Sequence, residues 1–168
     1  MPLKAKSKKN HFNWRFRSDH KKIALFLGLF LLPVPTVFSI DNLKLNEHLD
    51  YGSDSLDGPL ITGTDTQSGF VPGKPNYVIM YGEGCFNSKR QARRTVELYN
   101  KYRSRVHFVV IDLDVQRSPE QQQLVKVYYK GYIPHVLVLN GRGEPVYDQS
   151  GEVDSRVIED LFNGSASQ

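Results

Sequence analysis

The chemistry available to this sequence centres on one cysteine, Cys85, because the 168 residues contain no other. It follows the apolar run Tyr77–Tyr81 and precedes a stretch that is rich in Lys and Arg. A single thiol cannot form a disulfide within its own chain. It can be a small buried side chain, it can join two molecules, or it can act as a nucleophile.

The residue pattern on either side of the thiol predicts a strand before it and a helix after it. Tyr77–Tyr81 is a short apolar run between a proline and a glycine, which is typical of a buried strand. From residue 87 to about residue 102, apolar or small side chains recur at nearly helical spacing. Cys85 would therefore lie at a helix N-terminus, where N–H groups and the helix dipole favour a thiolate. Lys89 and Arg90 would add positive charge.

Strands and helices continue to alternate further along the chain. Ser118, Pro119 and Gln121 together are typical of a helix start, and Gly131 can end that helix at about residue 130. The remaining predicted elements are strands at 106–113, 136–139 and 145–148, a hairpin turn at 140–143 and a short helix from Asp154 through 161. The order predicts an α/β fold, a central mixed sheet flanked by helices.

The first 75 residues have a different composition. Residues 1–22 carry eight Lys or Arg and one acid, so the net charge of +4 for the whole chain leaves a mildly acidic remainder and gives no support for nucleic-acid binding. Residues 23–40 are apolar, and they are typical of a signal peptide or an uncleaved signal anchor, although two prolines weaken a membrane span. Residues 41–75 are rich in Gly, Ser, Asp and Thr, which predicts a flexible linker with one short strand near 59–62.

These segments predict an extracytoplasmic protein, because the basic flank of an export segment stays in the cytoplasm. It would be membrane-anchored through residues 23–40, or secreted if that segment is cleaved. The folded domain would cover 76–163, and residues 164–168 would form a disordered tail. No spacing of His, Cys and Asp suggests a metal site.

The stretch VIMYGEGCFNSKR resembles the strand, loop and helix around the reactive site of thioredoxin-like proteins, in which an apolar strand precedes a W-C-x-x-C-K/R run. The resemblance extends from about residue 76 to 162 and implies a thioredoxin-like fold. It places the attacking cysteine at Cys85, the second, resolving cysteine at Ser88 and the following basic residue at Lys89. Ile133-Pro134 is similar to the family's cis-proline loop, and Gly151 to a glycine of the substrate groove.

Three departures from the family pattern bear on mechanism. Ser88 replaces the resolving thiol, so the site can make the first attack on a disulfide, but glutathione or another thiol must then release the product. The family's buried carboxylate and its lysine partner fall at Ile79 and Val110, which are both aliphatic here. The usual aromatic residue before the cysteine is Gly84. Coupling to an ordinary thioredoxin reductase is therefore in doubt.

The first functional hypothesis is thiol–disulfide exchange on thiol- or disulfide-containing protein clients. Cys85 would be the nucleophile and Ser88 a hydrogen-bond donor to its thiolate, while Ile133 and Pro134 would offer an edge to the client. His135 lies next to the proline and would either protonate a leaving thiolate or face solvent.

The second hypothesis is a redox-inert module that binds a protein or peptide in the cis-proline groove, and the third is a dimer joined through Cys85. Whether the protein is an enzyme stays open. No cofactor is expected other than glutathione or another small thiol.

Overall fold

The computed structural model describes residues 42–63 and 66–164. The basic segment 1–22, the apolar segment 23–40 and the tail after 164 lie outside the described residues, so export and anchoring remain predictions. Within the two described ranges, no helix is long and apolar enough to cross a membrane.

A four-stranded mixed sheet forms the centre of the fold. Its strands are β3 (Asn76–Tyr81), β4 (His107–Asp112), β5 (His135–Leu139) and β6 (Pro145–Ser150), in the order β4-β3-β5-β6. β3 runs parallel to β4 and antiparallel to β5, and β6 is antiparallel to β5. β3 is buried along its whole length, which explains why its sequence is a continuous apolar run rather than an alternating one.

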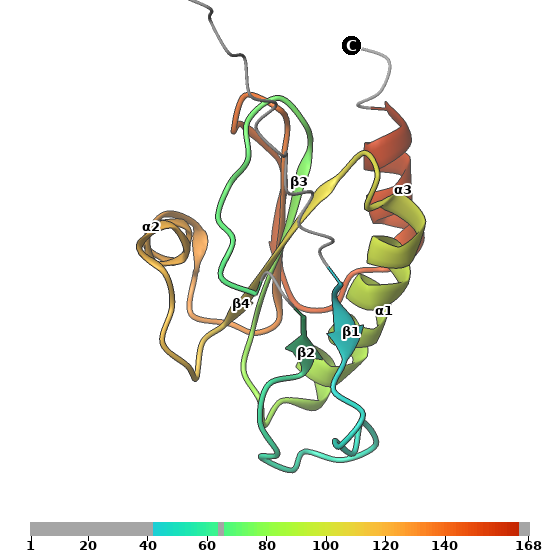
Figure 1. Cartoon of the computed structure of the whole chain (residues 1–168), viewed down its shortest axis with the longest axis vertical. Coiled ribbons are helices and arrows are strands. Elements are labelled where there is room, and N and C mark those ends of the chain that lie inside the picture. The colour runs from blue at the N-terminus through green and yellow to red at the C-terminus, as the bar shows by residue number, and fades with distance from the viewer. Residues whose placement is uncertain (1–41, 64–65, 165–168) are drawn as a thin grey trace, which may run out of the picture. The chain divides into compact units, whose positions relative to one another are not determined.

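Three helices cover the two faces of the sheet. α1 (Phe86–Tyr102) and α3 (Ser155–Gly164) lie on one face, and α2 (Pro119–Tyr128) lies on the other (Figure 1). The side chains of successive residues of β3 point to opposite faces of the sheet, as they do along any strand. Ile79 joins the apolar cluster that contains residues of α1 and α3, and Met80 joins the cluster that contains residues of α2.

The two predicted N-terminal caps are present, whereas Gly131 lies beyond Tyr129, the C-cap of α2, and does not end that helix as predicted. Ser118 Oγ accepts the Gln121 N–H at 3.2 Å and caps α2, and Asp154 Oδ1 accepts the Arg156 N–H at 2.9 Å ahead of α3. α2 ends at Tyr128, slightly earlier than predicted. The seven main elements and the mixed sheet confirm the predicted fold class.

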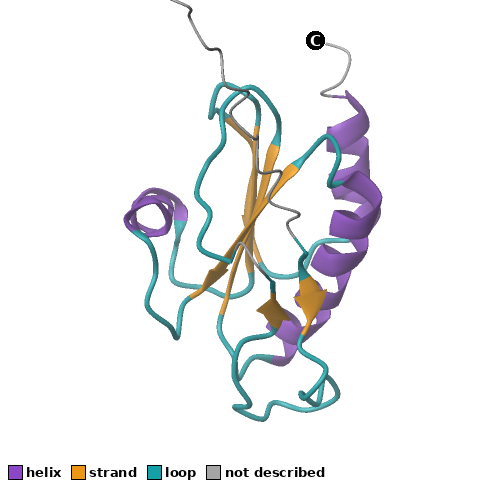
Figure 2. Cartoon of the chain, in the orientation of Figure 1, coloured by secondary structure: helices purple, strands orange, loops and turns teal. Residues whose placement is uncertain are grey.

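Residues 42–63 do not form the predicted flexible linker. β1 (Lys44–Leu45) pairs antiparallel with β2 (Ile61–Thr62), so the strand expected near 59–62 is present and has an unexpected partner. Leu43 and Leu60 are buried in the cluster on the α1 side of the sheet. These few apolar side chains are enough to attach the segment to the domain, because burial of apolar surface drives packing whatever the composition between them. The loop that joins the two strands reaches the end of α1 that carries its N-terminus (Figure 2).

Candidate functional site

Cys85 lies where the sequence predicts, between β3 and α1. It is the N-cap residue of α1, with extended backbone angles of φ −107° and ψ 118°, and its carbonyl accepts the first helical N–H, that of Lys89, at 3.0 Å. Its side chain is neither fully buried nor fully exposed. The thiol is therefore accessible at a helix N-terminus, where an anion is favoured.

The loop before β5 brings a proline next to the thiol. The Ile133–Pro134 peptide bond is cis, as the resemblance implied, and Cys85 Sγ lies 3.9 Å from the Ile133 carbonyl oxygen, to which the thiol can donate. Gly151 follows β6 with φ +98° and donates its N–H to the Pro134 carbonyl at 2.7 Å. Residues 48 positions or more from the cysteine in sequence are thus assembled around one sulfur atom.

Cys85 borders two open hollows. One has a volume of about 330 Å³, and we call it the thiol hollow; the other, of about 390 Å³, lies beside Asp54 and Phe86. The thiol hollow is lined by Leu56, Gly82, Glu83, Gly84, Cys85, Leu113, Asp114, Tyr129 and Ile133.

Residues 50–57, here called the strap, form a wall of both hollows that the sequence did not predict. Leu56 lies against Gly84, because a Cβ at position 84 would come within 2.4 Å of Leu56 Cδ2. Leu56 is nevertheless 80% exposed, so its apolar side chain stands in solvent beside the thiol. A side chain at position 84 would require Leu56 to move aside.

Lys89 has a different role from the predicted one. Its side chain is fully buried, and its Nζ donates to the Asp50 carbonyl at 2.6 Å and to Ser55 Oγ at 3.1 Å. The Asp57 carboxylate lies 3.5 Å away. A buried ammonium needs several acceptors, and the strap provides them. The Lys89 ammonium therefore holds the strap, and its hydrogen bonds go to the strap rather than to the Cys85 thiol.

Arg90 also departs from its predicted role of adding positive charge near the thiol, because its guanidinium is paired with a carboxylate. Arg90 donates to Asn87 and forms an ion pair with Glu152, which also binds Arg94. The charged side chains that line the thiol hollow are Glu83 and Asp114. The electrostatic surroundings of the thiol are thus acidic where the sequence predicted basic residues.

A main-chain hydrogen bond connects Glu83 to the side chain of Asp114. The Glu83 N–H donates to Asp114 Oδ2 at 2.7 Å, which ties the loop before Cys85 to the end of β4. Partial burial raises the pKa of Glu83, and the neighbouring carboxylates of Asp112 and Asp114 raise it further. Sequence reasoning missed this group, although the ends of two parallel strands share one edge of a sheet, which could have indicated it.

Ser88 follows the cysteine by one helical turn and is completely buried. Its hydroxyl has no hydrogen-bond partner among the described residues. The position fits the serine-for-cysteine replacement that the resemblance implies. The predicted hydrogen bond from Ser88 to Sγ is not formed in this structure, in which the thiol is directed to Ile133.

His135 does not face solvent, which corrects the sequence interpretation of this residue. It is fully buried on β5, with Nδ1 2.9 Å from Ser150 Oγ and Nε2 3.0 Å from Asp148 Oδ1. Burial lowers the pKa of His135, and the nearby Asp148 carboxylate opposes this shift. Both ring nitrogens face β6, so the ring has no path to a leaving thiolate at Cys85.

The two positions that the family uses for a buried acid and a lysine are neighbours in this fold. Ile79 of β3 pairs with Val110 of β4, and both are buried in apolar surroundings. In the described part of the chain, no group of His, Cys, Asp and Glu side chains could hold a metal ion.

A curated protein and two solved structures are similar to this chain. No family model matches the chain. Among curated proteins, it is similar to the chloroplastic thioredoxin-like protein HCF164 of Oryza sativa subsp. japonica, with 27% identity over 116 residues that cover 69% of this chain and 42% of that protein. The chain therefore spans about two fifths of the length of this relative.

Two solved structures give weaker likenesses. One is thioredoxin-2 of the malaria parasite, described as a component of its protein secretion machinery (16% identity, TM-score 0.44, 56% of this chain and 84% of the other). The other is the germline-specific thioredoxin Deadhead of Drosophila melanogaster (19% identity, TM-score 0.44, 54% and 80%).

The fold and the site define the class of protein. A mixed sheet between helices carries a cysteine at the N-terminus of α1, opposite a cis-proline. Together these features define a thioredoxin-like fold, and the chain is similar in sequence to a thioredoxin-like protein.

Proposed function

We propose that this protein carries out thiol–disulfide exchange through Cys85 alone. The observation that carries the proposal is the position of Sγ, which is accessible at the N-terminus of α1 and 3.9 Å from the Ile133 carbonyl beside the cis-proline. The helix N-terminus presents free backbone N–H groups and the positive end of the helix dipole, which can stabilise negative charge on an attacking sulfur atom.

The exchange requires two successive attacks. The Cys85 thiolate attacks one sulfur of a client disulfide, so that a mixed disulfide forms and the second client sulfur leaves as a thiolate. A small thiol such as glutathione, or a second thiol of the client, then attacks the mixed disulfide and regenerates Cys85. No electrons are gained or lost overall by the protein, which suits disulfide isomerisation and transfer better than net reduction.

Ser88 has a part in this proposal because its hydroxyl is buried without a partner one turn from the thiol. We propose that it donates to Sγ once the thiolate forms and releases the Ile133 carbonyl. A single hydrogen bond contributes about 0.5–1.5 kcal/mol, so Ser88→Ala should slow exchange by about two- to tenfold. An unchanged rate would remove Ser88 from the mechanism.

The proposal is tested with the full chain, a peptide that contains one disulfide, and glutathione. Wild type should accelerate the exchange of the peptide with glutathione and should give a mixed disulfide at Cys85 that intact-mass spectrometry detects. Cys85→Ser should lose both properties. Acceleration that persists in Cys85→Ser would contradict the proposal.

A Ser88→Cys variant tests the geometry separately. If the site is built for exchange and lacks only the second sulfur, this variant should release the mixed disulfide without added glutathione. Failure of Ser88→Cys alone would point to the aliphatic pair Ile79 and Val110, which cannot take up the proton of a resolving thiol.

The second candidate function, a redox-inert peptide-binding module, is favoured by two exposed apolar side chains, one beside the thiol and one next to Ile133 in the sequence. Leu56 and Tyr132 are 80% and 73% exposed. A module of this kind would retain its client in Cys85→Ala and would form no mixed disulfide in wild type. Capture of the client by wild type and by Cys85→Ala with equal affinity would therefore favour this candidate.

Exposure on the outer side of a membrane, through an anchor or a secretion signal at residues 23–40, remains part of the proposal. Labelling of intact cells with a membrane-impermeant thiol reagent tests it. Cys85 should be labelled without permeabilisation, and protection of Cys85 until the cells are opened would contradict export.

A further inference from the structure

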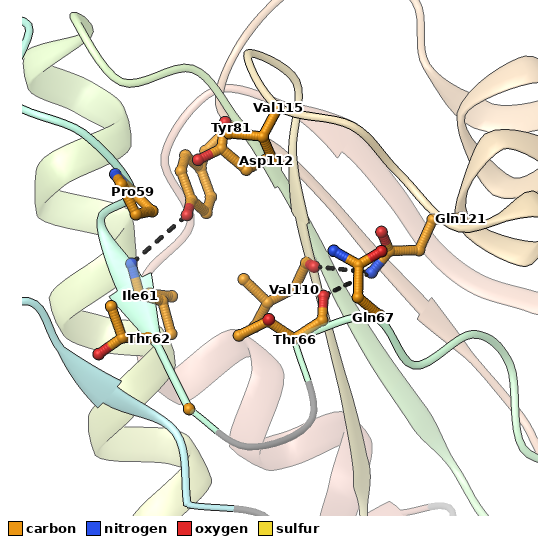
Figure 3. A pocket seen from close by; sticks show the side chains of 11 residues that line it. Pro59, Ile61, Thr62, Thr66, Gln67, Tyr81, Val110, Asp112, Val115 and Gln121 are labelled. Carbon is orange, nitrogen blue, oxygen red and sulfur yellow. Dashed lines mark hydrogen bonds between the residues drawn. The ribbon is translucent and has the colours of Figure 1, made fainter.

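A third cavity lies at the edge of the sheet, separate from the two hollows beside Cys85. Its volume is about 270 Å³, and it forms between the segment that contains β2 and the outer strand β4 (Figure 3). Pro59, Ile61 and Thr62 provide one wall, and Tyr81 and Val110 of the sheet provide the opposite wall. We call it the Asp112 pocket, after the carboxylate that lies at one end.

One end of the Asp112 pocket is closed by a glutamine. The Gln121 side chain from α2 donates to the Val110 carbonyl at 3.0 Å and to the Thr66 carbonyl at 2.9 Å (Figure 3). These bonds occupy the amide hydrogens and join α2, β4 and the N-terminal segment. The pocket is thus enclosed by fixed elements rather than by loose side chains.

Asp112 is the polar group in this pocket that lacks a partner. Its side chain is 7% exposed, and Oδ1 accepts the Asp114 N–H at 2.9 Å. Oδ2 is buried and accepts no hydrogen bond from the described residues. A buried carboxylate oxygen is costly when it is unsatisfied, and nearly all such atoms in folded proteins have a partner. Asp112 Oδ2 therefore has no partner with good hydrogen-bond geometry in the described chain, although the Tyr81 hydroxyl is near enough to lower the pKa of Asp112.

The neighbouring groups indicate which ligand would suit this acceptor. Among the described residues that line the pocket, none is Lys, Arg or His. The guanidinium of Arg117 is directed to main-chain carbonyls of residues 112, 113 and 115 rather than to the carboxylate. The carboxyl groups of Asp114 and Glu83 also act on Asp112, since the charge of Asp114 raises its pKa and a hydrogen bond with Glu83 lowers it. A cationic donor would satisfy Oδ2 and offset this local excess of negative charge.

The polarity of the walls and the volume of the pocket limit the size and chemistry of the part of the ligand that lies inside. Proline, isoleucine, valine and tyrosine side chains form an apolar lining, and the volume is slightly below the range of about 300–1,000 Å³ that drug-sized ligands require. An apolar cavity of about 150 Å³ binds benzene, so this pocket has room for a body of that size and one further group.

We propose that the Asp112 pocket binds a small amine, a compact apolar body with one protonated amino group that donates to Asp112 Oδ2. The site is independent of Cys85 and of the exchange proposed above. The amine can belong to a free small molecule or to the lysine side chain of a short peptide, and the test includes both.

The test is a methyl NMR titration of the full chain at pH 7 with benzylamine, which is a cation at this pH, and with benzyl alcohol, its neutral counterpart. Benzylamine should cause saturable shifts of the Ile61, Val110 and Val115 methyl groups and should bind about tenfold more tightly than the alcohol. Asp112→Asn should lower the affinity for benzylamine to that for the alcohol. Glu97→Gln, which removes an exposed carboxylate elsewhere, should change neither.

A second variant keeps the test valid if Asp112→Asn fails to fold. Val115→Trp should fill the pocket and abolish binding of both probes while Asp112 remains. A titration with a short lysine peptide separates the two sources of the amine, because it should compete with benzylamine only if a lysine side chain can enter. Equal affinity of the two probes in wild type, shifts outside the pocket, or no saturable shift would overturn the proposal.

Discussion

The central sheet and the N-terminal segment 42–63 contribute to the molecule in different ways. The sheet and its helices carry the functional groups, since Cys85 caps the N-terminus of α1 and Asp112 is the last residue of β4. The N-terminal segment has only four residues in strands, yet it provides walls of both the thiol hollow and the Asp112 pocket. The sheet and helices therefore carry the functional side chains, and the irregular segment 42–63 shapes the cavities beside those side chains.

The N-terminal segment 42–63 packs against the domain core at some positions and is exposed at others. Leu60 is fully buried in the domain core, whereas Leu56, four residues earlier, is 80% exposed above the thiol. The same residue type thus has a packing role at one position and a surface role at the other. Substitution of each leucine by alanine tests whether the two positions differ in this way.

The largest expected effect is that of Leu60→Ala. Removing a buried leucine side chain costs about 2–5 kcal/mol of unfolding free energy, because apolar contacts are lost and a cavity remains. The matched variant Leu56→Ala should change the unfolding free energy by less than about 0.5 kcal/mol. Urea unfolding of the two variants measures both values. Similar losses in both would show that the segment is not attached as described.

A smaller effect is expected for Lys89→Met, which removes the ammonium that holds the strap. The Asp50 carbonyl and the Ser55 hydroxyl lose a donor, and the variant should be less stable by about 1–3 kcal/mol. Amide hydrogen exchange should increase in residues 50–57 more than in the sheet. Lys126→Met, at an exposed position of α2, is the control and should change neither quantity. If amide hydrogen exchange in the strap is unchanged, Lys89 does not hold the strap, and its predicted electrostatic role beside the thiol is favoured instead.

The smallest effect concerns pH and a buried residue of the sheet. Burial holds the pKa of His135 below its ordinary value of 6.5, so the unfolded chain takes up a proton at this histidine more readily than the folded chain. Stability should therefore fall as the pH drops below about 6.5, towards the lowered pKa. Asp148 favours the charged ring and Lys130 opposes it, so the loss is partly offset.

Urea midpoints at pH 7.5 and pH 5.5 measure this dependence. His135→Gln should reduce the difference between the two midpoints, whereas His48→Gln, at an exposed position, should leave it as in wild type. An equal difference in wild type and His135→Gln would mean that His135 titrates alike in the folded and unfolded chains.

The sequence predicted the elements of the sheet domain because their signals are local. The apolar run of β3, the Ser118 cap and the position of Cys85 ahead of α1 each depend on a few adjacent residues. The cis bond at Pro134 followed from the family resemblance rather than from the residues themselves.

The parts that the sequence did not predict depend on contacts between distant residues. Nothing near Lys89 in the sequence indicates that its partners are at positions 50–57, and the polar composition of that segment suggested a linker. His135 looked like a strand-end residue facing solvent until β6 supplied Asp148 and Ser150 to pair with it.

The nucleophilicity of Cys85 in the folded chain is the most direct test of the account. We expect the full chain to react with glutathione disulfide at pH 7 about tenfold faster than a control in which Cys85→Ser is combined with Ser104→Cys, an exposed position at the far end of α1. The product should carry one glutathione on Cys85. A rate equal to or below that of the control would mean that the helix N-terminus does not activate this sulfur, and exchange through Cys85 would lose its physical basis.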